Sequence, residues 1–346
     1  MKQYDVNMIV ETKFGNYDVD FYDVETEPFR LYGVWREGDT FCRVPKAVAE
    51  TVSEGIFNRR ITTSGGRVRF ITDSPFIAIR AEYNACEHID LTALSCTVGF
   101  DLYADGVYAT TYRYLPEFDK ELIGLKDFGI KKERLYTLNL PTHSSIKKLY
   151  VGVSKGATIK RAPDYKYEKP VVFYGSSITN GSCASRPGMI YENIISRKLD
   201  MNYHNLGFGG LAKGEPQMAE YIAGLDMSVF VMDYDHNAPT PEHLLATHEP
   251  FFKAVRAKHP DIPVIMISRP TKCDILPQTA ERFNIIKRTY DNAKASGDSN
   301  VYLINGLEFF GELENECAVD GVHPTDLGFS LMAKGIGAVL KTILEI

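Results

Sequence analysis

Five short apolar runs alternate with longer helix-like segments after Pro170, and this alternation constrains the fold more than any other feature of the sequence. Short apolar runs are typical of buried parallel strands, and helices between them cover both faces of the sheet. The second half of the chain is therefore predicted to be a three-layer α/β/α domain with a parallel sheet. The predicted strands are 171–174, 203–206, 229–232, 264–267 and 301–304, and the predicted helices are 188–200, 215–225, 241–258, 278–296 and 326–344.

The first half of the chain is predicted to be all-β. Its strand-like runs are separated by Ser, Gly, Asp and Pro, and Asp105-Gly106 between two such runs predicts a hairpin. Many short strands favour a β-sandwich or jelly roll. The predicted division is a β-sandwich over 1–160, a linker over 161–170 and an α/β domain over 171–346. The strand-like runs are 67–72, 76–81, 98–103, 107–112, 135–140 and 148–153, with one helix-like patch at 45–57.

Ser177 has the position that a nucleophile needs in such a domain. The run 171–174 stops at Gly175, and Ser176 and Ser177 follow before a polar loop. A serine at the tip of a buried strand, just before a helix, presents its hydroxyl above the sheet and has its N–H near the positive end of that helix. On its own, such a serine is better explained as a helix cap or a turn residue.

Other polar groups fall at the same edge of the predicted sheet as Ser177. Sites in parallel sheets lie beyond the carboxyl ends of the strands. The segment 207–210 follows the second predicted strand, 233–237 follows the third, and 320–324 lies past the fifth, just before the last helix. This agreement is the main argument in the sequence for a functional site.

Each of these groups has a catalytic and a structural interpretation. His323 lies three residues after Asp320, a spacing that lets a carboxylate hold an imidazole in one tautomer. Gly210 can present an unobstructed N–H, and Asn237 can donate its amide to an oxyanion. The alternatives are an incidental surface histidine, a tight turn and a helix cap. Together with Ser177, the four supply a nucleophile, a base, its orienting carboxylate and oxyanion donors.

These residues resemble the four sequence blocks of the SGNH hydrolases, the GDSL-type lipase and acylhydrolase superfamily. The blocks are matched in order by Gly175-Ser176-Ser177, the stretch 205–210, Asp235-His236-Asn237 and the stretch 320–323. The resemblance covers roughly residues 170–346. It implies an SGNH domain with a flavodoxin-like, three-layer α/β/α fold.

The resemblance also implies a role for each matched residue. Ser177 is implied to be the nucleophile, and His323 the base that Asp320 orients. The oxyanion hole is implied to consist of the N–H groups of Ser177 and Gly210 and the side chain of Asn237. No metal and no organic cofactor is implied.

Two positions depart from the family's usual residues. Ser176 stands where Asp is usual, and Asp235 stands where Gly is usual. Neither position carries the main chemistry, so the departures bear on pocket shape and loop support. Tyr234, Asp235, His236 and Arg269 follow strand ends and are candidates for lining a substrate pocket, with structural or surface roles as the alternative.

The first half, with Gly99-Phe100-Asp101-Leu102-Tyr103, is similar to the β-sandwich domain attached to a subgroup of these enzymes. Some carbohydrate acetylesterases have a similar two-domain plan. The resemblance therefore implies a serine esterase that hydrolyses short-chain esters, acetyl esters on carbohydrate in particular. The expected partner is a small-molecule or oligosaccharide acyl ester. A lipase or thioesterase-type acylhydrolase for other esters is an alternative.

Two rival classes stay open. The stretch 207–212 fits the looser Gly-x-Gly-x-x-Ala fingerprint of dinucleotide-binding oxidoreductases, but it follows the second strand and leaves Ser177 and His323 unexplained. The other rival is a non-catalytic carbohydrate-binding protein with a degenerate hydrolase half. The presence of Ser177, Asp320 and His323 argues against that degeneracy.

Charge and composition limit the partners. The net charge is −6 and no cluster of Lys and Arg stands out, so neither nucleic acid nor a membrane surface is an expected partner. The N-terminus lacks the apolar core of a signal peptide, which predicts a cytoplasmic protein. The oligomeric state stays open. The cysteines lack metal-type spacing and are expected to be reduced and structural; they are Cys42, Cys86, Cys96, Cys183, Cys273 and Cys317.

Overall fold

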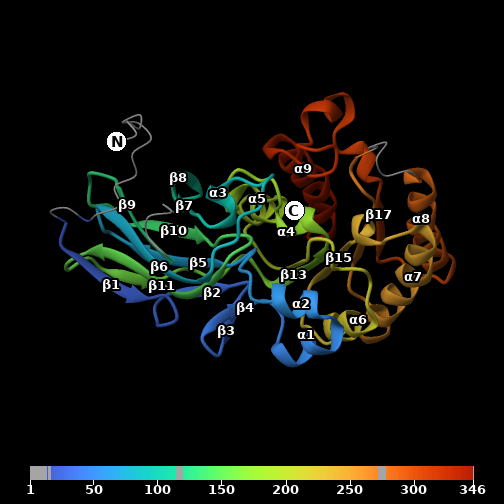
Figure 1. The fold of residues 1–346 in the computed structure, drawn as a ribbon, viewed down its shortest axis with the longest axis horizontal. Helices are drawn as coiled ribbons and strands as arrows, with labels where there is room; N and C mark the ends of the chain where they lie inside the picture. Colours follow the sequence, from blue (N-terminus) through green and yellow to red (C-terminus); the bar gives the residue numbers. More distant parts are fainter. Residues whose placement is uncertain (1–13, 15–16, 114–119, 272–277, 346) are drawn as a thin grey trace.

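The computed structural model describes residues 14, 17–113, 120–271 and 278–345, and Figure 1 shows a strand-rich region beside a helix-covered sheet. Helices of the first region are α1 (Lys46–Val52), α2 (Glu54–Arg59) and α3 (Leu94–Thr97). Its strands are β1 (Val19–Asp23), β2 (Arg30–Tyr32), β3 (Trp35–Glu37), β4 (Thr40–Cys42), β5 (Arg67–Thr72), β6 (Phe76–Ala85), β7 (Phe100–Ala104), β8 (Val107–Tyr112), β9 (Glu121–Asp127), β10 (Arg134–Asn139), β11 (Ser145–Ser154) and β12 (Ile159–Arg161).

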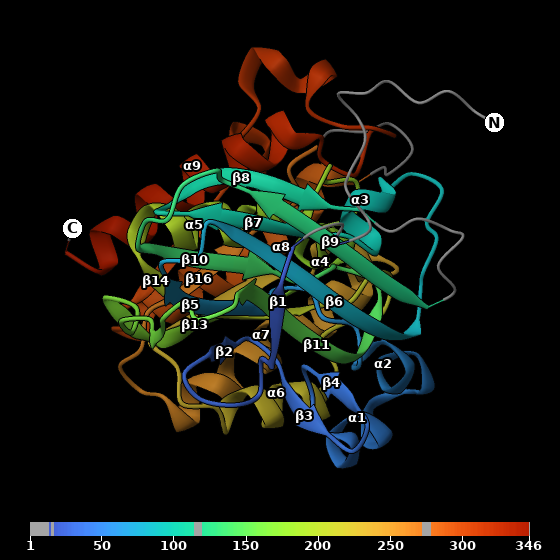
Figure 2. The same cartoon turned by 90° about the vertical axis from the view of Figure 1, so that its left-hand side faces the viewer.

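Two antiparallel sheets form the sandwich of the first region (Figure 2), and β3 and β4 pair with each other in a separate two-stranded sheet. The strand orders of the sandwich sheets are β1-β11-β6-β9 and β12-β5-β10-β7-β8, with β2 paired to β5. Alternate side chains along the strands, such as Val68 and Phe70 on β5 and Ile77 and Ile79 on β6, meet in one core between the sheets. The predicted β-sandwich is confirmed.

Local sequence explains two details of this region. The hairpin of β7 and β8 turns at Asp105 and Gly106, whose φ angles are 50° and 78°, as a two-residue hairpin turn requires. The single helix predicted over 45–57 is wrong, because Ser53 is extended and separates α1 from α2. The Ser53 side chain accepts a hydrogen bond from the Ile56 N–H and so caps α2.

The second region carries the predicted alternation of strands and helices. Its strands are β13 (Tyr167–Gly175), β14 (Met201–Gly207), β15 (Val229–Asp233), β16 (Val264–Ile267) and β17 (Val301–Ile304). Its α-helices are α4 (Ser177–Asn180), α5 (Tyr191–Leu199), α6 (Pro216–Ala223), α7 (Pro241–Lys258), α8 (Thr279–Ala295) and α9 (Asp326–Ile343). Short 3-10 helices are η2 (Pro187–Met189), η3 (Asp235–Asn237), η4 (Gly306–Glu308) and η5 (Gly311–Glu316).

The strands of this region form a parallel sheet in the order β14-β13-β15-β16-β17. Val172 and Tyr174 of β13 pack in a core with α6, α7 and α8. Val171 and Phe173 face the other side and pack with α5 and α9. The three-layer α/β/α fold with flavodoxin-like strand order is confirmed.

Element boundaries differ from the prediction between the two regions. The irregular stretch is shorter than the predicted linker over 161–170, because β12 pairs with β5 as far as Arg161 and β13 begins at Tyr167. Only residues 162–166 lie between these two strands. The helix predicted over 188–200 begins at Tyr191, because Pro187 and Gly188 form a 3-10 turn before it.

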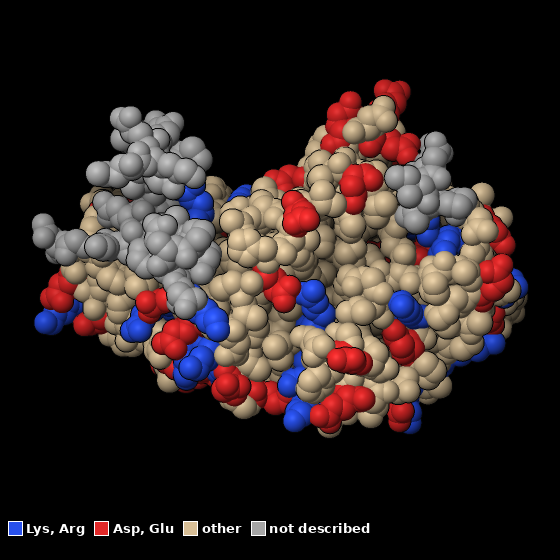
Figure 3. All heavy atoms as spheres, in the orientation of Figure 1, with Lys and Arg blue, Asp and Glu red and all other residues tan. Residues whose placement is uncertain are grey.

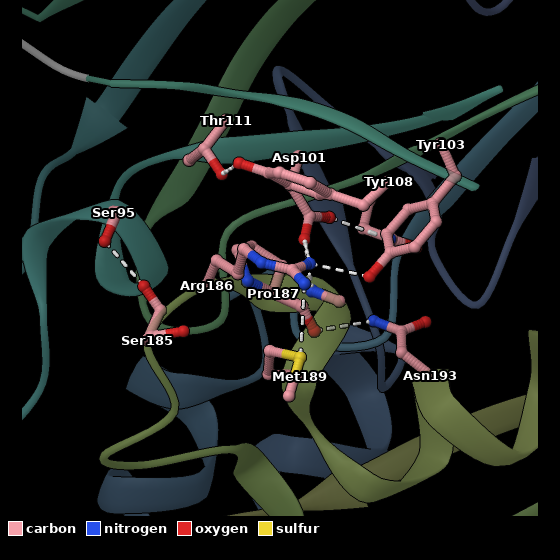
Figure 4. A network of polar contacts seen from close by, with 12 residues as sticks. Ser95, Asp101, Tyr103, Tyr108, Thr111, Ser185, Arg186, Pro187, Met189 and Asn193 are labelled. Carbon is pink, nitrogen blue, oxygen red and sulfur yellow. Dashed lines mark hydrogen bonds and ion pairs between the residues drawn. The ribbon is translucent and has the colours of Figure 1, made fainter. Parts of the chain in front are cut away.

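Polar side chains join the two regions (Figure 4). The buried Asp101 of β7 accepts hydrogen bonds from Arg186 Nη1 at 2.6 Å and from the Gly188 N–H at 2.9 Å. Arg186 also donates to the Tyr103 hydroxyl at 2.6 Å, and Asn139 donates to the other Asp101 oxygen at 2.8 Å. The Asp and Tyr of the sequence motif in β7 thus bind the first region to the segment that follows α4.

The described surface is mixed in charge, and the described cysteines are free thiols. Lys and Arg are interspersed with Asp and Glu over the face in Figure 3. None of the described helices combines the length and apolar character needed to cross a membrane. Cys42, Cys96, Cys183 and Cys317 are buried thiols, and Cys273 lies outside the described residues.

Candidate active site

Ser177 is the first residue of α4 and is separated from the end of β13 only by Ser176. The Ser176 side chain caps this short helix by accepting a hydrogen bond from the Ile178 N–H at 3.1 Å. N–H groups in the first turn of a helix have no acceptor within the helix, so the Ser177 N–H is suited to bind an anion. The Ser177 hydroxyl lies 2.8 Å from His323 Nε2.

Asp320 fixes both the loop and the imidazole of His323. Its Oδ1 accepts hydrogen bonds from the N–H groups of Val322 at 3.0 Å and His323 at 2.8 Å, and its Oδ2 lies 2.8 Å from His323 Nδ1. Partial burial raises the pKa of the Asp320 carboxyl, but the backbone and side-chain hydrogen bonds of His323 outweigh it and hold the pKa below its usual value. The carboxylate is therefore ionised at neutral pH and holds the Nδ1–H tautomer, which leaves Nε2 free to accept the serine proton.

The predicted oxyanion donors Gly210 and Asn237 lie together and are hydrogen-bonded to each other. The Gly210 N–H donates to Asn237 Oδ1 at 3.0 Å, and Asn237 Nδ2 donates to the Phe208 carbonyl at 2.8 Å. These two bonds fix the orientation of the amide, since a backbone N–H can only donate and a carbonyl can only accept. One N–H of Asn237 is left over. Gly210 therefore orients Asn237 in this structure, because its own N–H already has an acceptor.

Three of the four pocket candidates make buried structural contacts. Asp235 lies 3.3 Å from Arg269 Nε and 3.2 Å from Arg282 Nη1 in a buried cluster. Burial raises the pKa of Asp235, but the Arg269 guanidinium holds it below its usual value. Tyr234 packs in the core and bonds to Thr247 Oγ1 at 2.8 Å.

His236 is the fourth pocket candidate, and its ring nitrogens lack hydrogen-bond partners among the described residues. Both of these nitrogens are buried. Burial and the nearby Arg269 guanidinium lower the pKa of His236 to about 3. The imidazole is therefore neutral and carries one unused donor and one unused acceptor.

Asp233 is a buried acid that contacts Thr179 of α4, two residues after Ser177, and it carried no clear signal in the sequence. Thr179 Oγ1 and the Tyr191 hydroxyl lie 3.2 and 3.3 Å from Asp233 Oδ2. Burial raises the pKa of Asp233 to about 8, so it is mostly protonated at pH 7. Gly175 makes room for this packing, since a Cβ there would lie 2.0 Å from Thr179 Oγ1.

Arg43 of the first region forms hydrogen bonds with residues at the end of β14 and at the end of α4, close to Ser177 in the chain. The sequence analysis did not identify Arg43 as a site residue. The side chain is fully buried. Its Nη1 donates to the Gly207 carbonyl at 3.0 Å and to Asn205 Oδ1 at 3.1 Å, and its Nη2 donates to Asn180 Oδ1 at 3.2 Å. The guanidinium lies 4.6 Å from the centre of the Phe208 ring. The available signal was a single charged residue within the apolar stretch 41–44.

Arg43→Lys is expected to lower kcat about a hundredfold with little change in KM, because an ammonium cannot satisfy all these acceptors and the loop around Gly207 shifts. Arg67→Lys is the matched control. Arg67 is equally buried and donates to Asn202 Oδ1 at 2.8 Å and the Tyr203 carbonyl at 3.1 Å, at the other end of β14.

Both variants are expected to lose stability, on the order of 2–4 kcal/mol, because each leaves buried carbonyls without donors. Steady-state kinetics and urea unfolding separate the two effects. Equal losses of kcat in both variants would show that Arg43 acts through stability alone.

A cavity of about 110 Å³ lies where the two regions meet beside the nucleophile. A Cβ built on Gly209, one of its lining residues, would lie 3.2 Å from Ser177 Cβ. The lining combines Arg59, Thr62, Ile89 and His143 of the first region with Asn180, Ser182, Phe208 and Gly209 of the second. A larger cavity of about 490 Å³ lies between α7 and α8, beside residues that precede β16 and β17 and thus at the opposite edge of the sheet. In the described residues, His, Cys, Asp and Glu side chains form no group of three or more that could hold a metal ion.

Two family models match the sequence in the positions that the fold suggests. Residues 168–341 match the GDSL-like lipase/acylhydrolase family, and residues 19–159 match the N-terminus of SGNH-hydrolase-type esterases. None of the curated proteins compared with the chain matches it.

Solved structures share the whole two-region arrangement. A protein of Bacteroides ovatus described as a GDSL-like lipase is 28% identical, with a TM-score of 0.86 over 95% of this chain and 99% of the other. The salicylyl-acyltransferase SsfX3 of a tetracycline biosynthetic pathway is 21% identical, with a TM-score of 0.75 over 93% and 97%. A family two carbohydrate esterase of Clostridium thermocellum, in complex with cellohexaose, is 14% identical, with a TM-score of 0.66 over 92% and 99%.

Proposed function

The chain belongs to the GDSL-like lipase/acylhydrolase family and is a serine ester hydrolase, and from this we propose that it removes short acyl groups, acetyl above all, from carbohydrate esters. One observation supports the catalytic part of the proposal most directly. Asp320, His323 and Ser177 form an unbroken chain of contacts, 2.8 Å from Asp320 Oδ2 to His323 Nδ1 and 2.8 Å from His323 Nε2 to Ser177 Oγ.

The proposed first step is attack of Ser177 on the ester carbonyl. His323 Nε2 takes the hydroxyl proton as Oγ bonds to the carbonyl carbon, and Asp320 stabilises the imidazolium. The oxyanion accepts hydrogen bonds from the Ser177 N–H and from the remaining amide hydrogen of Asn237. When the tetrahedral intermediate collapses, the carbon–oxygen bond to the alcohol breaks and His323 returns the proton to the leaving oxygen.

The second step releases the acid. His323 takes a proton from a water molecule, which attacks the acyl-serine carbonyl through a second oxyanion. The Ser177 oxygen leaves with the proton from His323, and the free enzyme is restored. Gly210 contributes by holding the Asn237 amide in place through the 3.0 Å bond to Oδ1.

The cavity beside Ser177 supports a short acyl group and a polar substrate. Its volume of about 110 Å³ suits a group of a few heavy atoms, and Ile89 supplies an apolar wall. The Arg59 guanidinium adds donors of the kind that bind sugar hydroxyls. Carbohydrate esterases share the fold, and one was solved with cellohexaose bound, which favours a carbohydrate alcohol.

Acyl-chain selectivity tests the proposal. Turnover of nitrophenyl esters is expected to be highest for acetyl and at least about tenfold lower for octanoyl, since each methylene left outside the cavity forfeits about 0.8 kcal/mol and adds strain. Ile89→Ala removes an apolar wall and should raise octanoyl turnover relative to acetyl. Ile130→Ala is the control, because Ile130 is 59% exposed on the first region.

Two results would contradict this proposal. Equal or better octanoyl turnover in the unmodified chain would remove the acetyl assignment. An identical chain-length profile in Ile89→Ala and Ile130→Ala would remove the cavity as the acyl pocket. A panel of acetylated sugars, assayed by acetate release, then identifies the alcohol.

A further inference from the structure

The outer face of one sandwich sheet is polar, and the register of its strands shows why. Val68 and Phe70 point into the sandwich core, so Arg67 and Arg69 of the same strand point to the other face. Arg67 is paired with Asn139 and Arg69 with Thr137 on β10. This face lies against α5 and β14 of the second region, where Arg67 donates to the Tyr203 carbonyl at 3.1 Å.

Arg67 and Arg69 differ in how many of their N–H groups have hydrogen-bond acceptors. Arg67 donates to the Tyr165 hydroxyl at 3.1 Å and to Asn202 and Tyr203 of β14. Arg69 is 4% exposed, yet no described residue accepts a hydrogen bond from its Nε or Nη1. Its Nη2 lies 3.7 Å from Asp200 Oδ1, which is too long for a hydrogen bond, and its guanidinium lies 4.0 Å from the centre of the Tyr165 ring.

A cavity of about 240 Å³ adjoins this unsatisfied guanidinium. Arg197 of α5 also lines it, donating one N–H to the Gly188 carbonyl at 2.7 Å and stacking on the Tyr103 ring. Burial lowers the pKa of Arg197, so the cation is held there at an energetic cost. Asn193, seen in Figure 4 beside the polar contacts that join the two regions, lies on the same wall.

The charges around the cavity do not balance. Three guanidinium groups, those of Arg67, Arg69 and Arg197, line it together with one carboxylate, that of Asp200, whose side chain is 53% exposed. Arg186 nearby is already neutralised by Asp101 at 2.6 Å. An excess of about two positive charges is left in a partly enclosed site.

We propose that this cavity binds a small dianionic oxyanion, a phosphate group, between the two regions. Guanidinium groups pair with phosphate through parallel N–H···O bonds, and a dianion matches the excess charge. Arg69 on β5 and Arg197 on α5 would contact opposite sides of the ligand, so binding would tie the two regions together.

The site is separate from the proposed catalytic site. Asp200 immediately precedes β14, so the cavity lies at the amino end of that strand, whereas Ser177 lies at the carboxyl end of β13 in the same parallel sheet. Binding of phosphate and hydrolysis of esters are therefore measured independently.

Calorimetry on the full chain with inorganic phosphate, at constant ionic strength maintained with chloride, tests the proposal. Saturable binding and a higher melting temperature are expected. Arg69→Gln should weaken binding about tenfold to a hundredfold, because a charge-assisted bond is lost. Arg80→Gln is the control: Arg80 lies on β6 in the other sheet and pairs with Glu121 at 2.6 Å.

Arg197→Gln gives the same test at a partly exposed position if Arg69→Gln does not fold. Absence of saturable phosphate binding, or equal affinity in the variants and in Arg80→Gln, would overturn the proposal. A parallel titration with a hexose 6-phosphate identifies the source of the phosphate group. Tighter binding than inorganic phosphate indicates a phosphate monoester, and equal binding indicates the free anion.

Discussion

Ser177→Ala is expected to reduce ester hydrolysis by about 10⁵-fold or more while leaving the fold unchanged, because members of a triad act as a unit. The hydroxyl contacts His323 at 2.8 Å, and Ser177 is only partly buried at the first position of α4, so its loss removes little packing. Activity on nitrophenyl acetate and near-UV circular dichroism measure the two effects. A fluorophosphonate should label Ser177, as peptide mass spectrometry will show.

Ser182→Ala is the matched control, because Ser182 also contacts an imidazole, that of His143, at 3.0 Å. Burial lowers the pKa of His143 to about 3, and its Nδ1 bonds to the Thr142 hydroxyl rather than to a carboxylate. His143 is therefore a poor base, and Ser182→Ala should keep most of the activity and all of the labelling. Labelling of Ser182 or Ser176 would exclude Ser177 as the nucleophile.

His323→Ala is expected to be nearly as damaging as loss of Ser177, and Asp320→Asn to cost about 10⁴-fold. In Asp320→Asn the amide oxygen can still accept from the N–H groups of Val322 and His323, so the loop is kept. The amide NH₂ then faces Nδ1 and favours the tautomer with its proton on Nε2, which cannot accept the serine proton.

The double variant Ser177→Ala/His323→Ala separates a shared mechanism from independent effects. Its residual activity should match that of the worse single variant. A double variant that is lower still by a large factor would show that the two residues do not act together.

The α/β half was predictable because its signals are local. The apolar pattern of each strand and helix can be recognised within its own segment. Sites in parallel sheets lie beyond the carboxyl ends of the strands, and this rule alone places Ser177, Asn237 and Asp320 at one edge of the sheet. Strands β16 and β17 and helix α7 have the predicted bounds, and the other elements of this half differ by a few residues at their ends. The active-site assignment itself rests on resemblance and stays a prediction until the variants are measured.

Contacts between distant parts of the chain were not predictable in the same way. Arg43 meets Asn205 and Gly207 across about half the sequence, and nothing near Arg43 specifies those partners. Short edge elements such as β3 and β12 were missed because their residues are only partly buried, so alternation is weak. The contact of the Gly210 N–H with Asn237 Oδ1 was also not predictable, because a free N–H and a bonded one look alike in sequence.

The buried contacts of Arg43 and Asp101 also restrict how such enzymes can diversify. The two regions are separate in the chain but share buried interactions, since Arg43 and Asp101 of the first region each have hydrogen-bond partners in the second. Recombination that replaced the sandwich with an unrelated one would remove the hydrogen bond from Arg43 to the Gly207 carbonyl. It would also leave Arg186 without its carboxylate partner Asp101. New substrate preferences are therefore reached more readily by point substitutions in the loops that line the shared cavity than by shuffling whole modules.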